Sequence, residues 1–356
     1  MSAPDVPLPQ TPRPIISIGT GGIVHDAHLP AYRLAGFPVA GLYDRDQAKA
    51  RKLAAEFGIP KVFASLAEAV QSAPANAVFD VAVPANTLPE VLPSLPDGAA
   101  VLIQKPFGEN LTAARSLLAL CEQKRLQAAV NFQLRTAPAM AAARRLIAAG
   151  AIGELHDVEI RVTVFMPWQL WTFLEGIPRV EILYHSIHYV DLIRSFLGEP
   201  TGVYAKTVRH PLAPKLAGTR TTMALDYGDA IRATITTNHG HVFGRENQES
   251  YVKWEGTRGA LKARLGLLLD YPHGEPDTLD LCQLDNQGRP GSWQSVALNG
   301  NWYPHAFIGP MAALMRFANG ESPDLPTRVA DACRTMAVVE AAYESSARGA
   351  TPIPQP

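Results

Sequence analysis

Residues 182–191, with the sequence ILYHSIHYVD, place His185, His188 and Asp191 in a segment whose other positions are mostly apolar. Imidazole and carboxylate groups can bind a metal ion, exchange protons with a substrate, or be buried with polar partners. These three possibilities can be compared through helical spacing, because side chains three and four positions apart lie on one side of a helix.

The pattern around these residues predicts a helix with an apolar side and a polar stripe. At about 100° per residue, four polar side chains fall within roughly 60° of one another: Tyr184, His188, Asp191 and Ser195. Asp191 lies one turn from His188 and is placed to orient its ring, with His185 at the edge of the stripe. Burying such groups without partners costs about 1–3 kcal/mol each, so the stripe indicates a lined cavity, with satisfied core residues as the alternative. A metal site would use His185, His188 and Asp191, but no HExxH-like ligand set accompanies them, so we expect no metal.

A glycine-rich turn follows the first apolar run, in the sequence PIISIGTGGIV. The expected cofactor contacts in this turn are Gly19, Gly21, Gly22 and Ile23, since glycines let the backbone turn tightly and approach a pyrophosphate at a helix start. Asp44 ends the next apolar run, 44 − 21 = 23 residues after Gly21, close to the spacing of about 20 expected for an acid that binds a ribose hydroxyl.

These features favour a dinucleotide site over glycines that only make a tight turn. The charge of Asp44 favours NAD, because it would repel a 2′-phosphate, while the adjacent Arg45 keeps NADP possible. Val24 replaces the third glycine of the usual fingerprint, which predicts looser packing of the helix on the strand.

Buried strand patterns alternate with helices up to residue 133. They predict an α/β Rossmann domain with a doubly wound parallel sheet over residues 14–133, after a proline-rich flexible leader at 1–13. Residues 134–356 are strand-rich with few helices, which predicts an α+β domain with an open, mostly antiparallel sheet for substrate binding and oligomerisation. A C-terminal helix over residues 327–347 is expected to pack back towards the Rossmann domain.

Composition excludes several classes of partner. The formal net charge is −1, and no dense basic run predicts binding to nucleic acid or to an anionic membrane. No apolar stretch is long enough to span a bilayer, and three scattered cysteines predict neither a disulfide framework nor a thiolate zinc site. We therefore expect a cytoplasmic protein.

The order of these pieces resembles the glucose–fructose oxidoreductase, inositol dehydrogenase and rhizopine-catabolism family, Gfo/Idh/MocA. The resemblance covers nearly the whole chain and is carried by the segments GTGGIVHDAHLPA, VAGLYDRD, LIQKPFGENL, NFQLRTAP, AAGAIGEL, HSIHYVDLIRSFLG and VVEAAYESSARG. It implies a nicotinamide site with the lysine of a Glu-Lys-Pro motif, matched here by Lys105 and Pro106, with Gln104 in place of the glutamate. Family members often have a cis peptide bond before that proline.

The family's second motif, Asp-x-Gly-x-His-x-x-Asp, implies catalytic roles for His188 and Asp191. Tyr184 stands in place of the first aspartate and Ser186 in place of the glycine, so Tyr184 and His185 are the candidate substitutes for the missing carboxylate. Leu88 replaces a histidine that many members have. The resemblance thus predicts a preserved catalytic pair with altered surroundings.

Further site residues follow from the same resemblance. Pro84 and Asn86 are assigned to the cofactor site, with a turn or cap role as the alternative for Asn86. Gln133 and Arg135 are expected to face the substrate, with a surface ion pair as the alternative. Two aromatic residues are candidates for a wall against a sugar ring, with core packing or a subunit contact as the alternative: Trp168 and Trp171.

The resemblance implies an NAD(P)-dependent dehydrogenase that moves a hydride between nicotinamide and a hydroxyl-bearing carbon of a sugar, polyol or inositol-like substrate. Lys105, His188 and Asp191 are the expected catalytic residues, with His188 or Lys105 as the base. A non-catalytic NAD(H)-binding sensor is the alternative, favoured by the replacements at positions 104 and 88. The open sheet face is expected to be apolar and to pair subunits in a homodimer or homotetramer.

Overall fold

The computed structural model describes residues 6–354. The chain folds into two compact units: one runs to Ala141 and resumes over Asn299–Met336, and the other comprises Ala142–Leu298 and the residues from Ala337 onward. Of the predicted flexible leader, residues 1–5 lie outside the described residues. Gln10 and Arg13 nevertheless have fixed partners, because the Gln10 N–H donates to the Glu321 carboxylate and Arg13 Nε donates to Asn319 Oδ1 at 2.6 Å.

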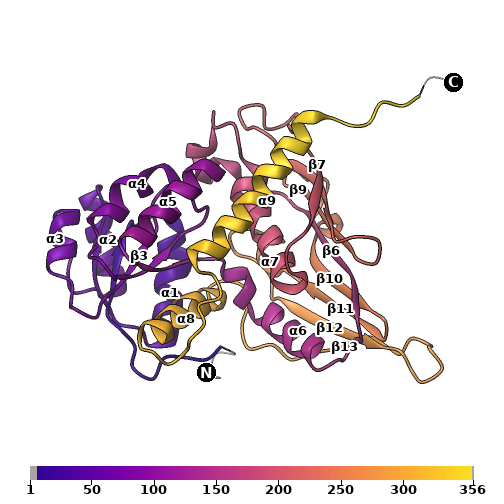
Figure 1. The fold of residues 1–356 in the computed structure, drawn as a ribbon, viewed down its shortest axis with the longest axis horizontal. Helices are drawn as coiled ribbons and strands as arrows, with labels where there is room; N and C mark the ends of the chain where they lie inside the picture. Colours follow the sequence, from indigo (N-terminus) through magenta and orange to yellow (C-terminus); the bar gives the residue numbers. More distant parts are fainter. Residues whose placement is uncertain (1–5, 355–356) are drawn as a thin grey trace. The chain divides into compact units, whose positions relative to one another are not determined.

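The first unit is built on a five-stranded parallel sheet in the order β2-β1-β3-β4-β5. In Figure 1 the label β3 marks this sheet. Its strands are β1 Ile15–Ile18, β2 Val39–Tyr43, β3 Val78–Val81, β4 Ala100–Ile103 and β5 Gln127–Val130. All residues of β1, β3 and β4 are buried, as expected of parallel strands covered on both faces. The predicted doubly wound α/β domain is confirmed.

Helices accompany these strands, and three of them begin at a residue whose side chain caps the helix. They are α1 Leu29–Ala35, α2 Gln47–Phe57, α3 Leu66–Gln71, α4 Leu88–Val91, α5 Leu111–Gln123 and, later in the chain, α8 Ile308–Ala318, which packs on β4 and β5. The Asp46 carboxylate accepts the N–H groups of Ala48 and Lys49 at the start of α2, and Asn110 Oδ1 accepts that of Ala113 at 2.9 Å at the start of α5.

The second unit contains an eight-stranded sheet in the order β13-β12-β11-β10-β6-β9-β8-β7. Its strands are β6 Leu155–Thr163, β7 Gly202–Val208, β8 Arg220–Asp226, β9 Arg232–Asn238, β10 Glu249–Gly256, β11 Gly259–Arg264, β12 Thr278–Gln283 and β13 Gln294–Ser295. The β6–β9 pair is parallel and the other neighbouring strands named here pair antiparallel, so the predicted mostly antiparallel sheet is confirmed.

The second unit contains α7 Ile187–Leu197, the part of α6 Pro138–Ala148 from Ala142, and the part of α9 Val329–Arg348 from Ala337. One sheet face is apolar and covered, with Val252 paired to Ile160 and the Phe196 ring of α7 5.3 Å from the Trp254 ring. Near its end, α9 binds the β7 edge through Ser345 Oγ, which accepts the Ala205 N–H at 2.9 Å.

The opposite face of the same sheet is charged, and the expectation of an apolar open face was wrong. Tyr251 lies beside Arg161 and Lys253 lies beside Glu159 across neighbouring strands. Ion pairs run over this face, including Arg161 with Glu249 at 2.6 Å. Strand alternation separates two faces, and the outward residues of β6 and β10 are ionic and pair with one another.

Within residues 6–354, no helix combines the length and the apolarity needed to cross a lipid bilayer.

Candidate functional site

The predicted cofactor residues of the first unit follow the carboxyl ends of its parallel strands. Gly19 comes directly after β1 and has φ +99°, a backbone conformation that favours glycine. A Cβ at Gly19 would lie 2.3 Å from the Ala82 carbonyl oxygen, just beyond β3. The strand order reverses between β1 and β3, and in open α/β sheets ligands bind at such a switch point.

The turn after β1 leaves space where a dinucleotide would approach. A Cβ on Gly21 would meet no atom within 4 Å, and the Gly21 carbonyl accepts the N–H groups of Val24 and His25 at 3.0 and 3.2 Å. A helical segment thus starts here, with Ile23 in its first turn and η1 Val24–His28 next. The first N–H groups of a helix have no partner within it and suit a phosphate.

Asp44, at the end of β2, is fixed against the same turn. Its Oδ2 atom accepts the backbone N–H and the hydroxyl of Thr20, each at 2.7 Å, and its Oδ1 atom accepts the Asp46 N–H at 2.9 Å. The carboxylate is therefore held in one orientation beside the glycines. Its neighbour Arg45 forms an exposed ion pair with Glu90.

The residues after β3 form a short turn. Pro84 precedes the 3-10 turn η2 Ala85–Thr87, and Asn86 is exposed within it, where its Oδ1 atom accepts the Thr87 hydroxyl at 3.4 Å. Leu88, which stands where many family members have a histidine, is fully buried at the start of α4.

Lys105 follows β4 at the same sheet edge. The Lys105–Pro106 peptide bond is cis, as the resemblance implied. Gln104 is buried, and its side-chain oxygen accepts the Lys105 N–H at 3.2 Å. The amide at position 104 thus binds backbone and supplies no negative charge to the lysine.

Gln133 and Arg135 lie in the 3-10 turn η4 Gln133–Thr136, after β5. Gln133 is buried, and its Oε1 atom has no hydrogen-bond partner among residues 6–354. Arg135 donates to Asp331 at 2.7 Å and to the Pro326 carbonyl at 3.2 Å. Arg135 is therefore ion-paired, but the pair is part-buried and does not lie at the surface as the alternative had it.

His188 and Asp191 are both buried within α7 of the second unit. Asp191 Oδ1 lies 3.9 Å from Arg194, one turn further on, and Arg194 also pairs with Glu199. Ser195, predicted to share their stripe, donates to the Leu192 carbonyl at 2.6 Å and accepts from Arg144 at 2.7 Å. Arg144 thus hydrogen-bonds Ser195, the last residue of the predicted polar stripe.

The segment before α7 is not the regular helix that was predicted. It is a π-helical turn, η6 Glu181–Ser186. The Glu181 N–H donates to the Gly218 carbonyl at 3.1 Å, and the Leu183 N–H donates to the Tyr343 hydroxyl of α9 at 3.3 Å. These two contacts hold the wider turn, which carries Tyr184 and His185.

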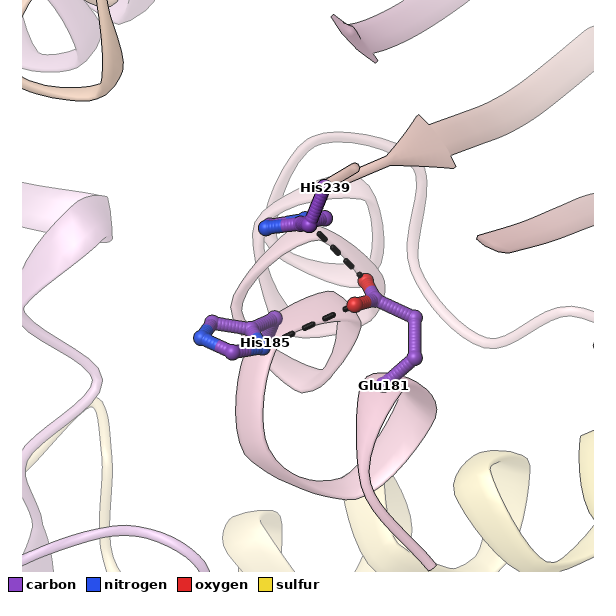
Figure 2. Close-up of side chains that lie close together, drawn as sticks. All are labelled: Glu181, His185 and His239. Atoms are coloured by element: carbon purple, nitrogen blue, oxygen red, sulfur yellow. Dashed lines mark ion pairs between the residues drawn. The ribbon is translucent and has the colours of Figure 1, made fainter. Parts of the chain in front are cut away.

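Three titratable side chains converge beside this turn (Figure 2). Glu181 Oε2 lies 3.6 Å from His185 Nδ1, and Glu181 Oε1 lies 3.4 Å from Nε2 of His239, the residue after β9. The two imidazole rings lie 4.7 Å apart at 30°. Burial favours the neutral form of the Glu181 carboxyl, but the two histidines outweigh this effect and hold its pKa below the ordinary value.

The two predicted tryptophans lie beside the same cluster. The Trp168 ring is 5.2 Å from His185 and 5.9 Å from His239, and the Trp171 ring is 5.2 Å from Tyr271. Both tryptophans are partly buried and pack on a small core of Leu174, Val180 and Leu216, as does Tyr184. The structure therefore brings Trp168, Tyr184 and His185 into one region of the second unit, with Trp171 adjoining.

Sequence reasoning missed Glu181 and His239. The Glu-x-x-x-His spacing of Glu181 and His185 was a readable signal, because residues four apart are neighbours on a helical turn. His239 gave none, since it lies 239 − 185 = 54 residues further along the chain.

A second buried cluster was also missed, in the first unit. His28 Nδ1 lies 2.8 Å from Asp80 Oδ2, which also accepts the Tyr32 hydroxyl at 3.0 Å, and Asn131 Nδ2 lies 3.3 Å from His28 Nε2. Burial, together with the charge of Asp80, raises the pKa of Tyr32 well above its ordinary value. This network joins η1 to β3 behind the glycine turn.

Comparison with known protein families shows which family the chain belongs to. Residues 15–132 match the model of an oxidoreductase family with an NAD-binding Rossmann fold, and residues 140–262 match the GFO/IDH/MocA C-terminal domain. The chain belongs to the Gfo/Idh/MocA family. Its first unit is accordingly an NAD-binding Rossmann domain, and the open Gly21 turn with the fixed Asp44 carboxylate fits that cofactor.

Similar proteins include two D-apiose dehydrogenases. The one from Rhizobium rhizogenes is 25% identical over 89% of this chain and 90% of its own length, and the one from Paraburkholderia graminis is 27% identical over 91% and 85%. The solved structure of an oxidoreductase from Agrobacterium radiobacter, in complex with NAD+, L-tartaric acid and magnesium, matches with a TM-score of 0.77 at 21% identity. It covers 96% of this chain and 98% of that chain, and it shows the shared fold.

Proposed function

We propose that this member of the Gfo/Idh/MocA oxidoreductases is an NAD(P)-dependent dehydrogenase that acts on a hydroxyl-bearing carbon of a sugar or polyol. The observation that carries the proposal is the row of residues after the parallel strands. Gly19, Asp44 and Lys105 follow β1, β2 and β4 at one sheet edge of the NAD-binding domain. A Rossmann domain without a catalytic role would not require a lysine at this sheet edge.

The cofactor would be held by the turn at Gly19, Gly21, Gly22 and Ile23, by Asp44, and by the segments at Pro84–Asn86 and Lys105–Pro106. Bound nicotinamide supplies a hydride acceptor or donor at C4. The backbone N–H groups at the helix start would bind the pyrophosphate, and Asp44 would accept a ribose hydroxyl, which favours NAD over NADP.

The proton chemistry is assigned to Lys105 and His188. In the oxidising direction His188 would take the hydroxyl proton of the substrate, since the ordinary imidazole pKa of about 6.5 suits this role near neutral pH. The Lys105 ammonium would donate a hydrogen bond to the same oxygen and stabilise its developing negative charge. Asp191 would hold the His188 ring in position.

A sugar is favoured as the substrate because the two D-apiose dehydrogenases cover most of this chain. Trp168 and Trp171 offer flat aromatic surfaces on which an apolar sugar face can stack. Gln133, Tyr184 and His185 are the proposed polar contacts, and we retain Arg135 as a weaker one because it is already paired.

We also propose a homodimer or homotetramer formed through the second unit's sheet. Because the outward face of that sheet is ionic, contacts between copies would consist largely of ion pairs, which salt weakens. A solution mass equal to one chain at micromolar concentration and low salt would contradict this assembly.

The proposed activity is tested with a panel of aldoses, polyols and inositols that includes D-apiose and D-xylose. Each compound is mixed with the protein and NAD or NADP, and the absorbance of the reduced cofactor is followed. We expect saturable turnover with at least one sugar, faster with NAD. Tight NAD binding without turnover of any compound in either direction would instead favour the NAD(H)-sensor function, for which Gln104 and Leu88 are the supporting replacements.

A further inference from the structure

We propose that Glu181, His185 and His239 bind a divalent transition-metal ion of the zinc class. One potential ligand atom from each residue lies within 4.8 Å of the other two, so the three are already gathered. Two imidazoles and a carboxylate suit zinc and its neighbours, whereas magnesium prefers ligand sets made of oxygen alone. All three residues belong to the second unit.

The distances fit metal ligands better than direct hydrogen bonds. Atoms bound at about 2.0–2.1 Å to a tetrahedral zinc ion lie roughly 3.4 Å from one another. Glu181 Oε2 lies 3.6 Å from His185 Nδ1, and the other carboxylate oxygen, Oε1, lies 3.4 Å from His239 Nε2. A charge-assisted hydrogen bond would be about 2.7–2.9 Å long. The buried His28–Asp80 pair in the first unit shows that shorter distance, at 2.8 Å.

A buried carboxylate such as that of Glu181 is stabilised by a positive charge nearby. The side chains of Glu181 and His239 are fully buried, and that of His185 is 21% exposed. Glu181 Oε2 has no hydrogen-bond partner among residues 6–354.

The surroundings resemble an outer shell that orients metal ligands. The Ser186 hydroxyl donates to Glu181 Oε1 at 2.9 Å, and the Trp168 ring lies 5.2 Å from the His185 ring and 5.9 Å from the His239 ring. Backbone contacts fix His239, whose N–H donates to the Thr219 carbonyl and whose carbonyl accepts the Met166 N–H. Three protein ligands leave at least one coordination position for water or for a substrate oxygen; the substrate oxygen rests on the proposed function.

The test uses the full-length, tag-free chain, stripped with a chelator and titrated with Zn2+, Co2+ or Mg2+ alone. We expect one Zn2+ per chain by calorimetry and elemental analysis, a visible Co2+ spectrum from nitrogen and oxygen ligands, and no comparable Mg2+ binding. His239→Asn and Glu181→Gln should each weaken Zn2+ binding by more than the roughly 10–100-fold typical of outer-shell changes. The exposed His156→Asn serves as the matched control and should bind as wild type does.

Thermal melting provides a second readout in case one variant folds poorly. Zn2+ should raise the melting midpoint of the wild type and of His156→Asn, but not that of His239→Asn, because an ion stabilises only a fold that binds it. Equal Zn2+ affinity in wild type and His239→Asn would overturn the proposal, as would a loss of binding in the control of equal size. Neither result depends on NAD or sugar, so both are separate from the dehydrogenase test.

Discussion

Asp44 has two roles in the first unit, and they can be separated. Its carboxylate holds the glycine turn through the two bonds from Thr20, and its charge is the proposed basis for preferring NAD. Asparagine keeps an acceptor for Thr20, but it removes the charge and the acceptor for the Asp46 N–H. Alanine removes both functions.

For Asp44→Asn we expect NAD affinity to fall about ten- to hundredfold, since hydrogen bonds to charged groups contribute about 1.5–3 kcal/mol. NADP affinity should rise, because the repulsion of the 2′-phosphate is lost. Calorimetric titration with each nucleotide measures both changes, and Asp97→Asn, at an exposed ion pair with Lys124, is the control. A parallel loss of both nucleotides would show that Asp44 acts only through the turn.

The site residues differ in whether a local sequence pattern marks them. His188 and Asp191 were found because a helical stripe and a family motif both marked them. His239 was missed because tertiary folding, and not sequence spacing, brings it to the turn, whereas Glu181 was missed although its spacing from His185 is a local signal. The ion pair of Arg135 with Asp331 has the same cause, since its partner lies 196 positions away.

The turn after β1 depends on one glycine for two reasons. Gly19 has a positive φ, and a Cβ there would collide with the Ala82 carbonyl. Gly36, at the end of α1, also has a positive φ but has no atom within 4 Å of its Cβ position. Alanine substitutions at these two glycines therefore separate the cost of colliding with the Ala82 carbonyl from the cost of a positive φ.

Gly19→Ala should destabilise the protein clearly more than Gly36→Ala, which we expect to cost about 1–2 kcal/mol from backbone strain alone. Denaturant unfolding of both variants, followed by circular dichroism, gives the comparison. NAD affinity should fall only for Gly19→Ala. If both variants were destabilised equally, the turns after β1 and β3 could move apart to admit the Cβ at position 19 without a loss of stability.

At the scale of elements, the sequence predicted the alternation of the first unit because short buried strands and well-capped helices have strong local signals. It did not predict the π-helical turn at Glu181–Ser186, whose residues also fit an ordinary helix. The contacts to Gly218 and Tyr343 that hold this turn come from distant parts of the chain. Such contacts leave no local pattern.

For the whole molecule, two architectures could be read from the sequence, and both are confirmed. The charged character of the open sheet face was misread, although Glu159 and Arg161 alternate with buried Val158 and Ile160 in the sequence and such polar positions face outward. Lys105 belongs to the first unit and His188 to the second.

The most direct test of this account is the turnover number of Lys105→Met and His188→Asn on the best sugar of the panel, with Lys49→Met and His156→Asn as exposed controls. Lost acid–base catalysis should lower kcat by about a hundredfold or more in each site variant. If both groups act on one oxygen, as proposed, the double variant should fall far less than the product of the two losses. The controls should match the wild type. Turnover within about threefold of wild type in both site variants would contradict the account, since that loss is far below the hundredfold expected.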